Sequence, residues 1–162
     1  MLVGFMAAGK TKIGRLLAER LKVPFIDSDA EIEAALGMTI AEIFASHGEP
    51  AFRIAERRVI SGLMEGGPKV VAVGGGAFVD PGTRAMLNGS ARTVWLDPGF
   101  DLIAQRLARS KTRPLASGRS EAELRLLWEH RRPFYAEAHV RVRTSDGDPR
   151  LAVDQIVQLL AS

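Results

Sequence analysis

Short apolar runs alternate with helical patterns along the whole chain. Five runs of aliphatic, β-branched or aromatic residues, each bounded by glycine, proline or charge, predict strands over 1–3, 23–26, 70–73, 93–96 and 140–142. Apolar residues at helical spacing predict helices over 10–21, 30–35, 39–45, 52–64, 81–87, 100–108, 120–137 and 150–160. Strands that alternate with helices predict an α/β fold with a parallel sheet covered on both faces.

Composition narrows the class of protein. The chain has 162 residues, 46% hydrophobic and 25% charged, which is typical of one globular domain over 1–162. Its longest uncharged stretch, 70–79, is too short for a membrane span of ~20 residues. The start lacks a basic region and meets Lys10 early, so we expect no signal peptide and a cytoplasmic protein. Without cysteine, disulfides, thiol chemistry and cysteine-bound zinc are excluded.

The charge pattern argues against nucleic-acid binding. The net charge is +3, and the arginines form small groups separated by acidic residues rather than one basic stripe. Such groups suit scattered contacts with anions in a cleft, since a guanidinium binds phosphate or carboxylate with two donors.

A phosphate-binding motif lies between the first strand and the first helix. Gly4, Gly9, Lys10 and Thr11 match G-x-x-x-x-G-K-[ST]. In such a loop the backbone N–H groups and the helix N-terminus bind phosphates, the lysine reaches the β- and γ-phosphates, and the hydroxyl serves magnesium. The chain contains neither Asn-Lys-x-Asp nor Asp-x-x-Gly, which argues against a GTPase. A small nucleotide-dependent kinase is therefore expected.

Two carboxylates follow the second predicted strand. Asp27 and Asp29 lie two residues apart at the carboxyl edge of the sheet, where ligands bind in this class of fold. One suits magnesium and the other suits an acceptor hydroxyl, which it would orient and deprotonate. The alternative is a helix cap at Ser28 or Asp29. A rival metal aspartate is Asp97, which ends another apolar run.

Three consecutive glycines, 74–76, follow the third predicted strand. Glycines at a strand end permit close approach of a ligand and offer N–H donors. The alternative is a simple turn before the helix that Asp80 caps.

Taken in order along the chain, these motifs resemble shikimate kinase. The resemblance also rests on Arg53 with Glu56, on Arg113 with Pro114, and on Arg131 with the segment 133–135. It implies a three-layer P-loop NTPase fold with five parallel strands in the order 2-3-1-4-5, an acceptor-binding region over about 30–60 and a mobile lid over about 110–119. It implies phosphorylation of the 3-hydroxyl of shikimate, with ATP as donor and Mg²⁺ as cofactor, on the route to chorismate and aromatic amino acids.

The resemblance also assigns roles to residues. The implied catalytic residues are Lys10, Asp29 and Arg113. The implied substrate-binding residues are Asp29, Arg53, Gly75, Gly76 and Arg131. The implied ATP-binding residues are Ala7, Ala8, Gly9, Lys10, Thr11, Lys12, Arg109, Arg113, Asp148 and Pro149, with Arg109 against adenine. Thr11 and Asp27 are implied at the metal.

The chain departs from the family pattern at Ala7, where the family usually has glycine, and it has only three residues before Gly4 where relatives have a longer first strand. Two alternatives stay open. One is another small-molecule kinase of the same shape, acting on gluconate or a nucleotide. The other is a nucleotide-binding module without turnover. The three histidines lack metal-ligand spacing, and we expect a monomer.

Overall fold

The computed structural model describes residues 1–109 and 118–162. Its sheet contains the strands β1 (Leu2–Val3), β2 (Phe25–Asp27), β3 (Val70–Ala72), β4 (Val94–Pro98) and β5 (Val140–Thr144). All four pairings are parallel, and the strand order is β2-β3-β1-β4-β5. The predicted sheet and its strand order are confirmed.

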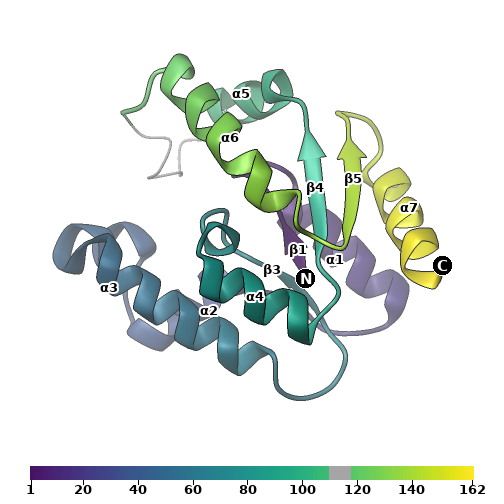
Figure 1. Cartoon of the computed structure of the whole chain (residues 1–162), viewed down its shortest axis with the longest axis horizontal. Helices are drawn as coiled ribbons and strands as arrows, with labels where there is room; N and C mark the ends of the chain where they lie inside the picture. Colours follow the sequence, from purple (N-terminus) through teal and green to yellow (C-terminus); the bar gives the residue numbers. More distant parts are fainter. Residues whose placement is uncertain (110–117) are drawn as a thin grey trace.

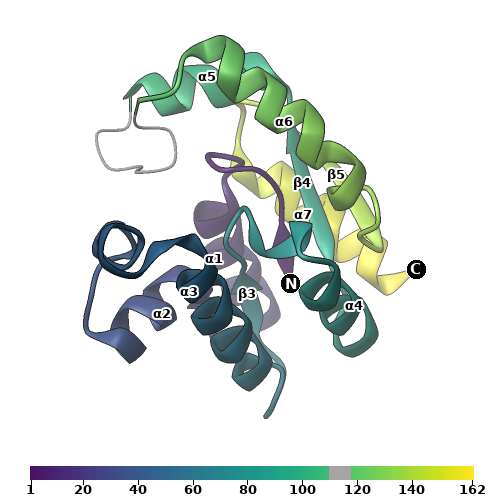
Figure 2. The ribbon, with the colours of Figure 1, turned by 60° about the vertical axis from the view of Figure 1, so that its left-hand side comes forward.

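Helices cover both faces of this sheet (Figures 1 and 2). On one face α1 (Lys10–Leu21) and α7 (Pro149–Ala161) bury Leu17, Ile156 and their neighbours against the strands. On the other face lie α3 (Ile40–Leu63), α4 (Pro81–Ser90), α5 (Phe100–Arg109), α6 (Glu121–Tyr135) and the short 3₁₀ turn η1 (Ala77–Val79). The helix α2 (Ser28–Leu36) packs with α3 around a smaller core that contains Ile32, Ile43 and Phe52. None of the described helices has the length and apolar character that a membrane crossing requires.

The predicted helices all form, with one difference. The predicted helices over 39–45 and 52–64 are joined in α3, which begins at a capping box of Thr39 and Glu42. Gly48 breaks the helix with φ 78° and ψ 172°, two residues before Pro50. This break re-aims the second half of α3, which carries Arg53 and the residues after it. Arg113 and most of the predicted lid over about 110–119 fall on residues 110–117, which lie outside the described residues.

A buried carboxylate ties α6 to the sheet. Asp97 of β4 is 6% exposed and accepts hydrogen bonds from Arg132 Nη1 at 2.7 Å and from Arg141 Nε at 2.8 Å. Both guanidinium groups also lie against the ring of Trp95, with Cζ to centroid distances of 5.1 and 4.7 Å. Because both carboxylate oxygens hold arginines, Asp97 fixes structure, and the rival hypothesis that it binds a metal is not supported.

We expect Asp97→Asn to lower the free energy of unfolding by about 3 kcal/mol. The change leaves two arginines around a neutral amide in a buried place, and breaking such pairs is costly. Urea unfolding followed by circular dichroism measures the loss. Asp101→Asn is the matched control, since the Asp101 side chain is 90% exposed and its pair with Arg125 spans 3.4 Å. An equal, small effect for both variants would contradict a structural role for Asp97.

Candidate active site

The loop between β1 and α1 has the shape of a phosphate cradle. Gly4 has φ 141° and Gly9, the residue before α1, has φ 94°, so both use backbone conformations that favour glycine. A Cβ on Gly4 would lie 2.6 Å from the carbonyl oxygen of Leu96, which shows how closely the loop passes β4. Lys10 Nζ donates to the carbonyls of Gly4 at 2.8 Å and Phe5 at 2.9 Å. The ammonium group is therefore held over the loop at the N-terminus of α1.

Ala7 keeps the shape of this loop without a glycine. It has φ 60°, a left-handed conformation that costs a residue with a Cβ about 1 kcal/mol. Arg106 Nη1 of α5 donates to the Ala7 carbonyl at 2.9 Å and holds this peptide in place. Ala7 thus adopts a backbone conformation that glycine, the usual residue of the family here, takes readily.

An oxygen pair lies beside the loop. Thr11 Oγ1 donates to Asp27 Oδ2 at 3.0 Å, while Asp27 Oδ1 accepts from the Asp29 N–H at 3.0 Å and caps α2. Asp27 is thus itself the cap, a role that the sequence suggested for Ser28 or Asp29. Within the described residues no group of three or more His, Cys, Asp or Glu side chains lies at metal-binding distance. A hydroxyl with one carboxylate nevertheless fits Mg²⁺, which takes few protein ligands beside water and phosphate oxygens.

Asp29 lies in a cavity of about 820 Å³ that it shares with Lys10, Thr11, Asp27 and Arg131. Burial raises the pKa of the Asp29 carboxyl, the negative charge of Asp27 raises it further, and Lys10 opposes both. A carboxylate with a raised pKa accepts a proton more readily. Asp29 therefore suits the abstraction of a proton from a hydroxyl bound in this cavity.

The glycine turn 74–76 borders the site, with Gly74 and Gly75 in the lining of the cavity, and it lies against a hydroxyl, a carboxylate and a guanidinium group. The N–H of Gly74 donates to Ser28 Oγ at 3.1 Å. An added Cβ on Gly74 would lie 2.7 Å from Asp29 Oδ1, and one on Gly76 would lie 2.4 Å from Arg53 Nη2. The sequence suggested that these glycines admit a ligand, which stays a prediction; in the structure Gly74 and Gly76 leave room for charged side chains and Gly75 for the backbone of the loop 4–11.

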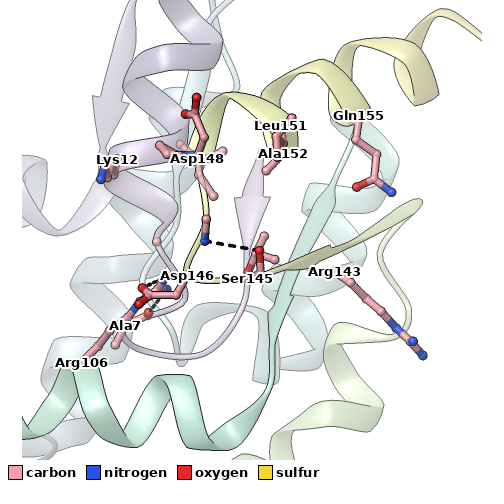
Figure 3. Close-up of a pocket in the computed structure, with 15 residues that line it drawn as sticks. Ala7, Lys12, Arg106, Arg143, Ser145, Asp146, Asp148, Leu151, Ala152 and Gln155 are labelled. Atoms are coloured by element: carbon pink, nitrogen blue, oxygen red, sulfur yellow. Dashed lines mark hydrogen bonds and ion pairs between the residues drawn. The ribbon is translucent and has the colours of Figure 1, made fainter.

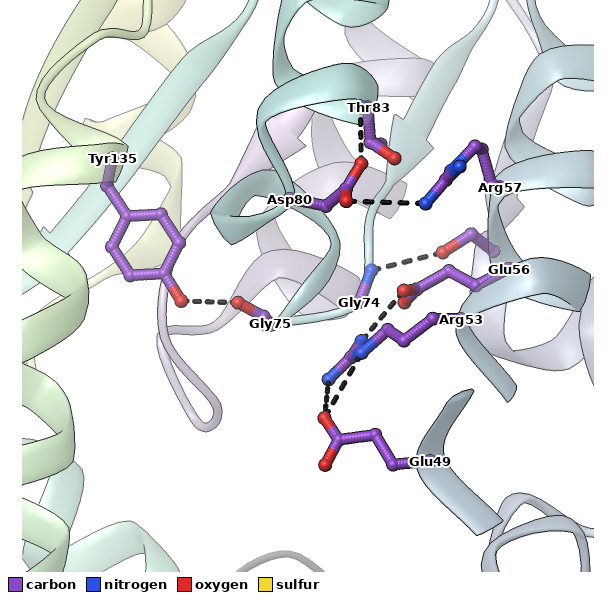
Figure 4. Close-up of polar contacts among 10 residues, drawn as sticks. Glu49, Arg53, Glu56, Arg57, Gly74, Gly75, Asp80, Thr83 and Tyr135 are labelled. Carbon is purple, nitrogen blue, oxygen red and sulfur yellow. Dashed lines mark hydrogen bonds and ion pairs between the residues drawn. The ribbon is translucent and has the colours of Figure 1, made fainter. Parts of the chain in front are cut away.

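Arg53 is braced by two acids. Arg53 Nη1 lies 2.7 Å from Glu56 Oε2, and Nη2 lies 3.1 Å from Glu49 Oε1 (Figure 4). Glu56 is 3% exposed, and burial raises its pKa although the charge of Arg53 lowers it. Arg53 and Gly76 are next to one another and adjoin Gly75, which lines the cavity. The sequence pattern contained Glu56 but did not indicate its burial.

Arg131 of α6 faces the same cavity. It is 9% exposed, and its Nη1 has no hydrogen-bond partner among the described residues. A buried guanidinium nitrogen without an acceptor is costly, so this group calls for an anionic partner. The neighbouring Arg132 points to Asp97 instead.

A second cavity, of about 420 Å³, lies beside the phosphate loop (Figure 3). It is lined by Ala7, Gly9, Lys12, Asp148 and Pro149, as expected for part of a nucleotide site, and also by Arg106. Asp148 caps α7 by accepting from the Arg150 N–H at 2.9 Å.

The structure places Arg109, which the sequence assigned to adenine, on an exposed part of α5 and outside the lining of this cavity. Arg106, one helical turn earlier, lines this cavity. Sequence reasoning missed Arg106 because both arginines precede the predicted lid.

Comparisons with known proteins agree with this geometry. A family model described as shikimate kinase matches residues 6–161. A shikimate kinase of Caulobacter vibrioides is 49% identical over 161 residues, covering 99% of this chain and 80% of the relative. A shikimate kinase of Bradyrhizobium diazoefficiens is 44% identical, with 99% and 78% of the two chains covered.

Solved structures show the same likeness. Shikimate kinase from Acinetobacter baumannii, in complex with shikimate, matches with a TM-score of 0.92 and 41% identity over 99% of this chain and 90% of that chain. A gluconokinase from Sinorhizobium meliloti matches with a TM-score of 0.64 and 21% identity over 99% and 90%, which shows a shared fold alone.

The electrostatics of the cavity predict that Asp29→Asn stabilises the fold at neutral pH. An acid whose pKa is higher in the folded state binds its proton more tightly there, so stability falls as pH rises from the usual pKa through the raised one, and the cost is complete above it. Replacing the carboxylate removes that cost.

Thermal unfolding at several pH values measures the effect. The melting temperature of Asp29→Asn should exceed that of the wild type at pH 7, and the gap should close in acid. Asp154→Asn, a change at an exposed position of α7, serves as control and should shift neither curve. A less stable Asp29→Asn at pH 7 would show that the carboxylate is stabilised where it lies.

Proposed function

This chain belongs to the shikimate kinase family, and on that premise we propose that it transfers the γ-phosphoryl group of ATP to the 3-hydroxyl of shikimate. The observation that carries the proposal is the buried, unpartnered Nη1 of Arg131, which shares one cavity with Asp29 and with Lys10. An acceptor for this cavity must offer a negative group to the arginine and a hydroxyl to the carboxylate. Shikimate has both.

We infer that the donor lies across the two cavities. Its phosphates would bind the N–H groups of the loop 4–11 and Lys10, and its base would enter the cavity bounded by Asp148 and Pro149. There Arg106, which lines the cavity, would contact the base, and the role implied for Arg109 stays a prediction. Thr11 and Asp27 would hold Mg²⁺, which supplies charge neutralisation between the phosphates.

On the acceptor side, the region 30–60 together with α6 would bind shikimate. Arg131 and Arg53 would bind the carboxylate, and N–H groups of the glycine turn would assist them. Asp29 would orient the 3-hydroxyl and take its proton as the oxygen attacks the γ-phosphorus. Lys10 would neutralise charge on the transferring group, where such stabilisation has its largest effect.

Both alternatives have weaker support. The gluconokinase likeness extends to the fold alone, although gluconate also has a carboxylate. A module without turnover would need no acceptor site, whereas the shared cavity of Asp29 and the buried Arg131 favours an enzyme. Ala7, the one sequence feature that favours such a module, adopts a left-handed conformation that glycine also adopts, and Arg106 holds its carbonyl.

The direct test measures ADP release with ATP and Mg²⁺ in the presence of shikimate, gluconate or nucleoside monophosphates. We expect turnover with shikimate, and phosphorus NMR should show a phosphate monoester on the 3-oxygen. Lys10→Ala should lower turnover by orders of magnitude while the circular dichroism spectrum is retained. Turnover with gluconate or a nucleotide alone would reject the assignment, and no turnover with any acceptor would favour the binding module.

Arg131→Ala should raise the KM for shikimate by roughly ten- to a hundredfold and leave the KM for ATP unchanged, because one charge-assisted contact with the carboxylate is lost. Steady-state kinetics with each substrate varied in turn measure both constants. Arg125→Ala is the matched control, since Arg125 lies on α6 with a side chain that is 45% exposed. Equal losses for ATP and shikimate would place Arg131 outside the acceptor site.

A further inference from the structure

The glycine turn is held from the side of α6 by the only tyrosine of the chain. Tyr135 is 1% exposed, and its hydroxyl donates a hydrogen bond to the carbonyl of Gly75 (Figure 4). Burial raises the pKa of Tyr135 to about 12, so the phenol remains a donor throughout the neutral range. The contact joins residues 60 positions apart in sequence.

We propose that Tyr135 is a positioning residue for the acceptor, because its hydroxyl sets the direction in which the N–H of Gly76 points. The peptide bond between Gly75 and Gly76 is planar and trans, so its C=O and N–H point in opposite directions. Fixing the Gly75 carbonyl toward α6 therefore aims the Gly76 N–H away from α6. Figure 4 shows Arg53 on that opposite side of the turn.

The hydrogen bonds of the turn leave two donors for a ligand. Gly74 N–H is used by Ser28 Oγ at 3.1 Å, and Ala77 N–H is used by the Gly74 carbonyl at 3.1 Å. Within residues 1–109 and 118–162, the N–H groups of Gly75 and Gly76 have no acceptor. Ser28 thus holds the N–H of Gly74 and Tyr135 holds the carbonyl of Gly75, and the N–H groups of Gly75 and Gly76 lie on either side of that carbonyl along the chain.

The turn needs this brace because its own sequence supplies none. Glycine gains nothing from side-chain packing and pays the largest backbone entropy to be ordered. Gly76 also borders Arg53, which we propose for the carboxylate of shikimate. A rotated Gly75–Gly76 peptide would turn its carbonyl toward that anion, and attraction would become repulsion. The inference rests on the proposed function and adds to it a residue that does not touch the acceptor.

Tyr135→Phe tests the proposal, since it keeps the ring against Trp95 and removes only the hydroxyl. We expect the KM for shikimate to rise about tenfold, the loss of one hydrogen bond, with kcat and the KM for ATP within about twofold of wild type. Thr93→Val is the matched control. It removes a buried hydroxyl that donates to Asn88 Oδ1 at 2.7 Å. Thr93 directly precedes β4 and so lies at the amino ends of the strands, whereas the proposed acceptor site lies at their carboxyl ends.

The control distinguishes a positioning role of Tyr135 from a purely structural one. If the role were purely structural, Tyr135→Phe and Thr93→Val would both lower the melting temperature and both leave the KM for shikimate unchanged. Fluorotyrosine labelling of the wild type gives one fluorine resonance, which should shift when shikimate is added and remain in place when gluconate is added. That measurement also decides the matter if Tyr135→Phe fails to fold. An unchanged KM in the variant or an unmoved resonance would overturn the positioning role, whereas a wild type inactive with shikimate would reject the proposed function itself.

Discussion

The acceptor side of this protein depends on one steric constraint, the absence of side chains at three consecutive positions after β3. An added Cβ would lie 2.7 Å from Asp29 at Gly74, 3.3 Å from the Met6 nitrogen at Gly75, and 2.4 Å from Arg53 at Gly76. Each glycine therefore admits a different part of the site: the proposed base, the phosphate loop and a guanidinium group. A methyl group at Gly74 or Gly76 would displace the charge of Asp29 or Arg53, so the turn sets how closely these groups of the proposed site approach one another.

Gathering these groups creates an electrostatic cost that the rest of the fold must offset. The pKa values of Asp29 and Glu56 are both raised by burial, and Arg131 holds a nitrogen without a partner in the described residues. Buried charged groups of this kind lower stability and are common at active sites. The compensation lies on either side of them, in the two apolar layers around the sheet and in the Asp97 cluster that holds α6.

The sequence predicted the features that depend on local spacing and missed the contacts that depend on tertiary packing. Alternating apolar periods sufficed for the strands and helices, and the spacing of Gly4, Gly9 and Lys10 sufficed for the phosphate loop. Arg109 and Arg106 lie one turn apart on α5, and only the packing of that helix shows that Arg106 lines the cavity beside the phosphate loop. The Tyr135 contact with Gly75 joins residues 60 positions apart, so no local sequence pattern predicts it.

The helix α6 contacts both the proposed acceptor site and the buried carboxylate of Asp97, and helical geometry explains how one helix can do both. Arg131 and Tyr135 are four residues apart and so share a face, which is turned toward the cavity and the glycine turn. Arg132, the next residue, points away from that face and joins Asp97 beneath the indole ring of Trp95. The ion pair of Arg132 with Asp97 therefore fixes the rotation of α6 about its axis. That rotation decides whether the guanidinium group of Arg131 and the hydroxyl of Tyr135 face the site. Loss of this ion pair would therefore disturb the acceptor site, even though neither Arg132 nor Asp97 lines the cavity.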